Sequence, residues 1–321
     1  MKPVVLVTAI GTAASTTISV ELRKTNDYYI IGADIYENYM VASSKDVDEF
    51  FVFPSAIDDF DLYIEFALGF CSEHHVQYYF PTIDEEVVNL SNNRSRFETI
   101  GVKLCIPNHK LIEICHYKNV FNKWIRDNFS NLSITTYSAL SEISKECYPL
   151  FLKPIEGRAS NGCKKLSNQA ELMEIMENSD VFRTNVVQQY VTGDIIVVDL
   201  IRSSATNQML MLQREEILRN GSGCGIAVEI INDKNLVQIC ENLMVALDLN
   251  GIVNAEFFAS SDGYKIIEIN PRFSAGTSFS CLAGINTVIN ALNIVDKKAL
   301  NYGSALIGRH FAKRYETYQT D

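Results

Sequence analysis

The stretch that decides the fold is Ile266-Ile267-Glu268-Ile269-Asn270-Pro271-Arg272, and Asn254-Ala255-Glu256-Phe257-Phe258 precedes it in the chain. Between the two lies Ser260-Ser261-Asp262-Gly263, whose Asp-Gly pair is typical of a tight hairpin turn. The pattern therefore predicts two antiparallel strands, over residues 251–259 and 264–269, joined by a short turn.

Oxygen-bearing side chains share one face of this predicted hairpin. Alternation places Glu268 and Asn270 on the same face of the second strand, and the tight turn brings Glu256 within reach of it. Two carboxylates and an amide on a rigid surface suit Mg²⁺ held together with phosphates and water. Arg272 projects just past this face, where a guanidinium can stabilise charge on a transferring phosphoryl group. A solvated face with ordinary surface acids is the alternative, but the opposed Asn-x-Glu and Glu-x-Asn-Pro-Arg patterns favour the metal site.

Two further segments suit a nucleotide. Phe151-Leu152-Lys153-Pro154 places a lysine at the end of an apolar strand, which is costly unless the ammonium meets a negative partner. The loop that follows, residues 155–163, contains two glycines and small residues, so its backbone N–H groups can close on phosphate oxygens. Residues 186–194 form a strand that runs into a short hinge, whose backbone can bind adenine. Taken alone, each segment also fits an ordinary strand and turn. In the first segment the lysine would then lay its carbon chain along apolar surface and keep its ammonium group in water.

The N-terminal third follows a βαβ pattern. Residues 3–8 are a continuous apolar run, typical of a strand buried on both faces. A small-residue loop over 9–17, a helix over 18–24 and a strand over 28–34 complete the unit and predict a doubly wound sheet. A nicotinamide dehydrogenase is one function for such a unit, but Ala9-Ile10-Gly11-Thr12-Ala13-Ala14 lacks the required Gly-x-Gly-x-x-Gly.

Composition excludes several classes of protein. The 321 residues are 47% hydrophobic, enough for a substantial core in two or three lobes. A formal net charge of −11 disfavours nucleic acid as a partner. The eight cysteines are scattered without Cys-x-x-Cys, so we expect reduced thiols in a cytoplasmic protein rather than a zinc site. No run of 18 apolar residues predicts a membrane span, and the N-terminus has the pattern of a strand rather than a signal peptide.

In this order, the segments resemble the ATP-grasp superfamily, most closely its carbamoyl-phosphate-synthase-like and amino-acid-ligase branches. The resemblance covers roughly residues 118–272 and is most specific at residues 268–272. It implies an α/β (α+β) fold with two α+β lobes enclosing ATP. The parts it implies are a Rossmann-like N-terminal domain with a parallel sheet (1–107), a central lid subdomain (108–192) and a C-terminal catalytic subdomain (193–321).

The same resemblance implies roles for individual residues. Glu256, Glu268 and Asn270 would hold Mg²⁺, for which Mn²⁺ can substitute. Arg272 would stabilise the phosphoryl group, and Arg214 falls where relatives carry an arginine that faces substrate or phosphate. The ATP-binding residues it implies are Lys118, Lys153, Gly157, Ser160, Asn161, Gly162, Gln189, Tyr190, Val191 and Asp194.

Two positions depart from the family's pattern. Gln189 stands where a glutamate is usual, a change that main-chain contacts to adenine would survive. Ile195 stands where an acid usually binds the ribose, and a shift of one residue would let Asp194 serve. Separately, Asp84-Glu85-Glu86 predicts an acidic helix N-terminus, stabilised by the helix dipole, or an acid close to the substrate.

The function that the resemblance implies is an ATP-dependent ligase. It would activate a carboxylate as an acyl phosphate, release ADP, and join the acyl group to an amine or a similar nucleophile. The alternatives are a carbamoyl-phosphate-synthase-like kinase of carboxyphosphate or carbamate, and an ATP-binding pseudoenzyme. The expected partners are small-molecule carboxylates and amines, without nucleic acid or membrane, and a homodimer is left open.

Overall fold

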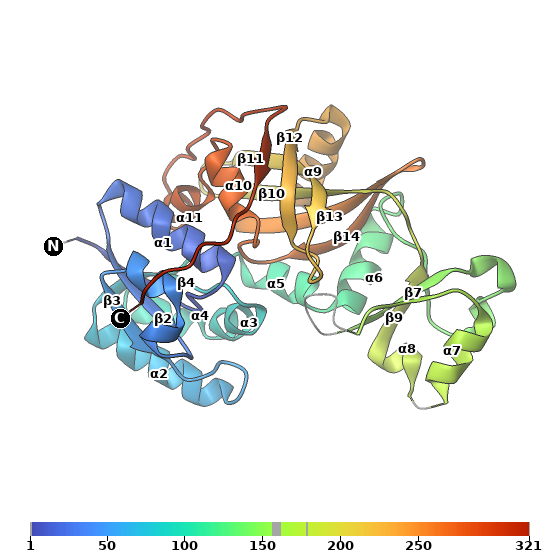
Figure 1. Ribbon diagram of the computed structural model, residues 1–321, viewed down its shortest axis with the longest axis horizontal. Coiled ribbons are helices and arrows are strands. Elements are labelled where there is room, and N and C mark those ends of the chain that lie inside the picture. Colours follow the sequence, from blue (N-terminus) through green and yellow to red (C-terminus); the bar gives the residue numbers. More distant parts are fainter. Residues whose placement is uncertain (1, 156–161, 178, 321) are drawn as a thin grey trace.

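The computed structural model describes residues 2–155, 162–177 and 179–320. The chain forms three sheets, with helices around them (Figure 1). The α/β architecture predicted from the sequence is confirmed, because a parallel sheet precedes two antiparallel sheets along the chain. Gly157, Ser160 and Asn161, which the sequence assigns to the loop over the phosphates, lie outside the described residues.

The N-terminal part is built on a parallel sheet in the order β3-β2-β1-β4-β5. Its strands are β1 (Val4–Val7), β2 (Tyr29–Asp34), β3 (Glu49–Val52), β4 (Val76–Phe80) and β5 (Lys103–Leu104). Its helices are α1 (Ala13–Thr25), α2 (Phe60–Glu73), α3 (Asp84–Asn92) and α4 (Arg94–Thr99), with 3₁₀ turns η1 (Asn38–Met40) and η2 (Ala42–Asp46). The order reverses at β1, as it does in doubly wound sheets.

The first helix corrects the prediction from the sequence. We expected a loop as far as residue 17, but α1 begins at Ala13. Thr12 caps it by accepting a hydrogen bond from the backbone N–H of Ser15. Hydroxyl side chains are tolerated here because they bond to nearby carbonyls, as Thr17 Oγ1 does to Ala13 O at 2.9 Å.

A small antiparallel sheet forms a separate lobe in the order β6-β9-β7-β8 (Figure 1). Its elements are β6 (Thr136–Tyr137), η3 (Leu140–Glu142), η4 (Lys145–Cys147), β7 (Leu150–Pro154), β8 (Lys164–Leu166), α7 (Gln169–Met176), α8 (Val181–Thr184) and β9 (Asn185–Gln189). Two helices lead into it, α5 (His109–His116) and α6 (Lys118–Asn128). Tyr117 adopts an extended backbone conformation and separates the two helices.

The third and largest sheet has the order β14-β13-β10-β11-β12-β15. Its strands are β10 (Asp194–Ser203), β11 (Gln208–Arg219), β12 (Gly225–Ile231), β13 (Gly251–Ser260), β14 (Gly263–Asn270) and β15 (His310–Ala312). The helices of this part are α9 (Lys234–Ala246), α10 (Thr277–Leu282) and α11 (Thr287–Val295). The predicted hairpin is confirmed as β13 and β14, whereas the sequence analysis missed β12 and β15.

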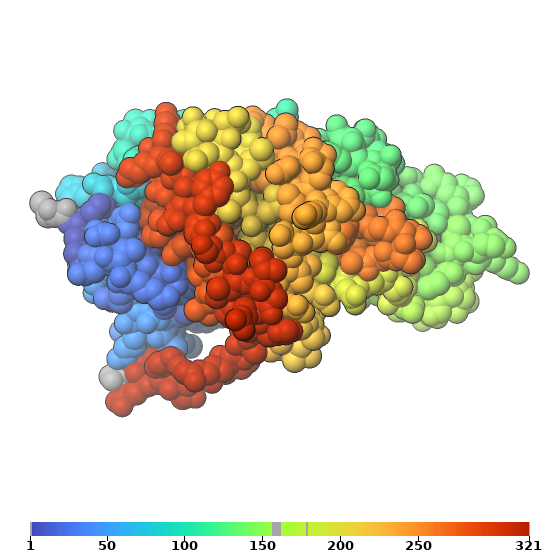
Figure 2. Space-filling model, turned by 90° about the horizontal axis from the view of Figure 1, so that it is seen from above, coloured from blue at the N-terminus to red at the C-terminus, as the bar shows by residue number. Residues whose placement is uncertain are grey.

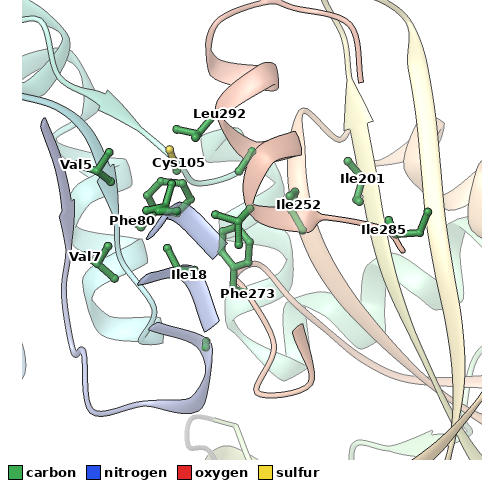
Figure 3. Packing of buried hydrophobic residues seen from close by; sticks show 14 of the residues in the cluster. Val5, Val7, Ile18, Phe80, Cys105, Ile201, Ile252, Phe273, Ile285 and Leu292 are labelled. Carbon is green, nitrogen blue, oxygen red and sulfur yellow. The ribbon is translucent and has the colours of Figure 1, made fainter. Parts of the chain in front are cut away.

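The N-terminal part and the large sheet share one core. Val5 and Phe80 of the parallel sheet belong to the same buried cluster as Ile201 and Ile252 of the large sheet (Figure 3). The small lobe has a core of its own, which includes Leu152. Because burying apolar side chains is the main favourable term in folding, the first two parts hold each other in place more firmly than either holds the small lobe.

The C-terminal segment runs across the surface from the large sheet to the N-terminal part (Figure 2). Lys313 donates a hydrogen bond to the carbonyl of Ala275 (2.6 Å), and Thr320 donates one to the carbonyl of Tyr39 (2.7 Å). Among the described residues, none of the helices combines the length and apolar character that crossing a bilayer requires.

Candidate active site

A cavity of about 890 Å³ lies where the three parts meet. It is lined by residues of α3, α5, α6, the small lobe and the large sheet. The predicted site residues that line it are Lys118, Lys153, Tyr190, Val191, Arg214, Glu256, Glu268, Asn270 and Arg272. Gly162, Gln189 and Asp194 are exposed and do not line it, whereas Gln188 and Ile195 do. Alternation along a strand explains this difference between neighbouring side chains, and the predicted main-chain contacts of the hinge with adenine stay a prediction.

The candidate metal ligands come together on the β13–β14 hairpin. Glu256 pairs directly with Glu268, and Asn254 pairs with Asn270. Directly paired residues of antiparallel strands point to the same face, so the four side chains share the side that lines the cavity. Asn270 Nδ2 donates a hydrogen bond to Glu268 Oε1 at 3.0 Å, which orients both side chains.

Two facing carboxylates in a buried place need a cation or a proton. Burial and the adjacent Glu268 carboxylate raise the pKa of Glu256 above its ordinary value. A divalent cation would relieve the same repulsion, so the donor set of Glu256, Glu268 and Asn270 fits Mg²⁺ with phosphate oxygens completing its shell. No group of three His, Cys, Asp or Glu side chains within the described ranges could hold a metal, so the phosphates are needed for a full set of ligands.

An arginine and a further acid, both missed in the sequence, adjoin the paired carboxylates. Arg219 Nη2 donates to Glu256 Oε2 at 2.9 Å, and its Nε lies 2.8 Å from Glu216 Oε2. Arg219 is the last residue of β11, five positions after Arg214. Two irregularities in its pairing with β12 follow Glu216, so simple alternation could not have placed Arg219 toward Glu256.

Arg214 is the centre of a fully buried polar network. Its side chain is 1% exposed, and Nη1 donates to Asp199 Oδ2 at 2.9 Å. Nη2 donates to Ser274 Oγ at 3.1 Å, and Asn254 Nδ2 donates to Asp199 Oδ1 at 2.9 Å. Gly276 packs on the guanidinium so closely that a Cβ there would lie 2.7 Å from Nη2. The network holds Arg214 in one position at the cavity wall.

Lysines approach the cavity from the small lobe and from α6. Lys153 ends β7, is buried, and donates from Nζ to the carbonyl of Ile267 at 3.3 Å. Burial lowers the pKa of Lys153, and the nearby Glu268 carboxylate opposes this shift. Lys118 is the first residue of α6. Tyr190 follows β9, and its ring lies 6.2 Å from that of Phe151, so aromatic surface also lines the cavity on this side.

An ion pair links the large sheet to the N-terminal part beside the cavity. Arg272 Nε donates to Asp84 Oδ1 at 2.8 Å. Asp84 is the first residue of α3, so the predicted acidic helix N-terminus is confirmed, and one of its acids binds the candidate catalytic arginine. The contact fixes the guanidinium between the hairpin and α3.

These features define a class: a three-part α/β protein whose central cavity is lined by paired acids together with lysines and arginines. The chain belongs to the ATP-grasp domain family, whose model matches residues 115–276. Residues 5–105 match a second model, described as the PylC-like N-terminal domain.

Individual relatives are more distant. The carbamoyl phosphate synthase large chain of Clostridium acetobutylicum is 23% identical over 63% of this chain and 21% of its own length. The 3-methyl-D-ornithine–L-lysine ligase of Methanosarcina acetivorans is 25% identical over 44% of this chain and 37% of its own. The chain therefore spans well under half of these curated relatives.

Solved structures share the fold over almost the whole chain. The biotin carboxylase domain dimer of 2-oxoglutarate carboxylase from Hydrogenobacter thermophilus, in complex with MgADP, ADP and bicarbonate, superposes with a TM-score of 0.74. It is 16% identical, and the match covers 95% of this chain and 72% of that one.

Proposed function

We propose that this chain is an ATP-dependent ligase that activates a carboxylate as an acyl phosphate and transfers the acyl group to an amine. The observation that carries the proposal is the pairing of Glu256 with Glu268 on a cavity wall, with Asn270 beside them. Membership of the ATP-grasp family supports the nucleotide, and the MgADP-bound neighbour supports the cation.

The chain's own residues divide the work of binding and orienting. Lys118 and Lys153 would neutralise the triphosphate, with Tyr190 and Val191 beside the adenine. Glu256, Glu268 and Asn270 would hold Mg²⁺, which supplies positive charge to the β- and γ-phosphates. Arg272, kept in place by Asp84, would stabilise the charge that develops on the transferring group.

The reaction then needs positioning more than a side-chain nucleophile. A substrate carboxylate oxygen forms a bond to the γ-phosphorus, and the bond from that phosphorus to the β,γ-bridging oxygen breaks, with ADP as leaving group. The amine next attacks the acyl carbon and loses a proton, and inorganic phosphate leaves. Enclosure of the cavity by three parts of the chain limits hydrolysis of the acyl phosphate.

Relatives guide the choice of substrates. The name of the Methanosarcina relative describes the joining of two amino acids, which favours an amino acid for at least one substrate here. The match to carbamoyl phosphate synthase large chains favours a second candidate, a kinase that forms carboxyphosphate from bicarbonate or phosphorylates carbamate in the same cavity. Under the first proposal the partners are small carboxylates and amines in the cytoplasm, and whether the chain forms a homodimer stays open.

The test is ADP and phosphate release from Mg-ATP with pools of amino acids and small carboxylates. We expect turnover that depends on one pool and is lost in Glu268→Ala. Glu229→Ala, which removes an acid of the same sheet outside the cavity, is the matched control and should retain turnover. Release of ADP with bicarbonate as the sole added carboxylate would favour the second candidate. Failure to bind ATP with Mg²⁺ present would overturn both.

A further inference from the structure

A line of alternating charges crosses the cavity wall from β11 to β13. Arg214 Nε lies 3.8 Å from Glu216 Oε1, and Arg219 Nε lies 2.8 Å from the other oxygen of Glu216. Arg219 then reaches Glu256, which faces Glu268. The line ends in two opposed acids. Within the part of the chain that the structure describes, Arg219 is the arginine that forms an ion pair with a candidate metal ligand.

Arg219 is held mainly by charge, with one side-chain hydrogen bond among the described residues. Its Nη2 donates that hydrogen bond to Glu256 Oε2 at 2.9 Å. Although Nε and Glu216 Oε2 lie 2.8 Å apart, neither atom has a hydrogen-bond partner within the described part of the chain. The side chain is 27% exposed, against 1% for Arg214, whose Nη1 and Nη2 both donate to buried partners although its Nε also has none among the described residues. A half-satisfied buried group is costly, so this arrangement suits a side chain that exchanges partners.

We infer that Arg219 is an internal counter-ion that exchanges with the divalent cation at Glu256. The inference rests on the metal site of the proposed function. A cation bound by Glu256 would lie within a few ångströms of the guanidinium, and like charges about 4 Å apart repel by several kcal/mol at a protein surface. The two therefore compete for the same carboxylate. Before the metal arrives, Arg219 keeps three neighbouring acids from facing one another uncompensated, and it is a positioning residue.

Competition between Arg219 and the cation predicts that the effect of removing Arg219 depends on metal, which an ordinary ion pair would not show. In Arg219→Gln without metal, Glu256 loses its guanidinium opposite Glu268, and Glu216 keeps only the more distant Arg214, so the melting temperature should fall below that of the wild type. Saturating Mg²⁺ should narrow or close this gap. Mn²⁺ added alone, without nucleotide, should bind the variant about 5-fold or more tightly than the wild type, which is the lower end of usual coupling between sites.

Controls separate exchange from a structural contribution. Arg202→Gln removes an ion pair of the same sheet, between Arg202 and Asp248 at 3.0 Å, away from the cavity. It should lower the melting temperature equally with and without Mg²⁺ and leave Mn²⁺ affinity unchanged. Arg219→Lys keeps the charge with fewer donors, and its Mn²⁺ affinity should lie between those of wild type and Arg219→Gln, which keeps the test valid if the glutamine variant fails to fold.

The outcomes distinguish this inference from the proposed function. If the wild type and Glu268→Ala bind Mn²⁺ identically, the wild type has no Mn²⁺ site that depends on Glu268. That result would overturn the metal site and, with it, this inference. Mn²⁺ binding that needs Glu268 but is equal or weaker in both Arg219 variants would overturn the exchange and leave the metal site standing.

Discussion

Two buried glutamates, Glu86 on α3 and Glu256 on β13, show how one chemical group serves different ends. Glu86 is 4% exposed and accepts hydrogen bonds from Thr8 Oγ1 and Tyr63 OH, each at 2.8 Å, and from the backbone N–H of Thr82 at 3.3 Å. All these donors are neutral. Burial raises the pKa of Glu86 to about 7, although these donors favour the ionised form and oppose the shift.

Glu256 has the opposite surroundings. It faces the acid Glu268, binds the guanidinium of Arg219, and lines the cavity. Burial raises its pKa too, but a like charge adds to the shift. The comparison shows that a carboxyl group with a raised pKa is not by itself a functional site. Glu256 lines a cavity and faces a like charge, and these two features mark it as a candidate functional residue. Glu86 has a structural place instead, because its hydrogen bonds join the ends of β1 and β4 to α3.

The largest expected difference is in turnover. Glu256→Gln should reduce ADP release by about 100-fold or more, the scale seen when a group that stabilises transition-state charge is removed. Glu86→Gln should change turnover only a few-fold, because its amide oxygen can accept from one of the two hydroxyls and its NH₂ group can donate to the other. Initial rates with saturating Mg-ATP measure both. Equal losses would mean that Glu86 belongs to the active site and that the contrast is false.

For stability we expect the opposite order, with a larger loss from substitution of Glu86 than from substitution of Glu256. Glu86→Ala leaves Thr8, Tyr63 and Thr82 with unsatisfied buried donors and opens a cavity, so the free energy of unfolding should fall by about 4 kcal/mol. Urea unfolding monitored by circular dichroism measures the change. Glu256→Ala removes a carboxylate that burial and a neighbouring acid already disfavour, and it should cost less in metal-free protein. A greater loss from Glu256→Ala would contradict this assignment.

Much of the fold could be predicted because hydrophobic periodicity is local. The strand predicted over residues 28–34 differs from β2 by one residue at one end, and the β13–β14 hairpin differs from its prediction by one residue at three of its four ends. The break at Tyr117 depends on one backbone conformation, and β12 and β15 pair only through tertiary structure, so their sequences gave little local signal.

The candidate site was predictable only where one motif carried several residues. Glu268, Asn270 and Arg272 stand in one short segment, and Glu256 is opposite it. Arg219 could not be predicted in the same way, because a register irregularity changes its face. Asp84 was predicted as a helix-terminal acid, but its contact with Arg272 joins residues 188 positions apart.

The titration of Glu86 gives a smaller effect that depends on pH. Its ordinary pKa is 4.5 and its folded value is about 7, so between these values the folded protein holds a proton that the unfolded chain has released. The stability is therefore fully present below about pH 4.5 and falls as pH rises toward 7, by at most about 3 kcal/mol. Glu86→Gln should flatten this slope in urea unfolding measured across the window. An unchanged slope in the variant would assign it to other groups.

The smallest predicted effect concerns the ion pair between Asp84 and Arg272, which connects the N-terminal part to the cavity. Asp84 belongs to the N-terminal part, yet it orients Arg272 at the edge of the cavity, and both side chains are 21% exposed. A partly exposed ion pair contributes about 1 kcal/mol or less to stability, so Asp84→Asn should barely change the free energy of unfolding.

Turnover should fall about 10-fold in Asp84→Asn, since the asparagine can keep the hydrogen bond but not the charge that holds the guanidinium. The KM for Mg-ATP should change less than kcat, because Arg272 is expected to act on the transition state rather than on the bound nucleotide. If Asp84→Asn instead raised KM alone, α3 would contribute to binding rather than to chemistry, and the N-terminal part would have no share in the reaction.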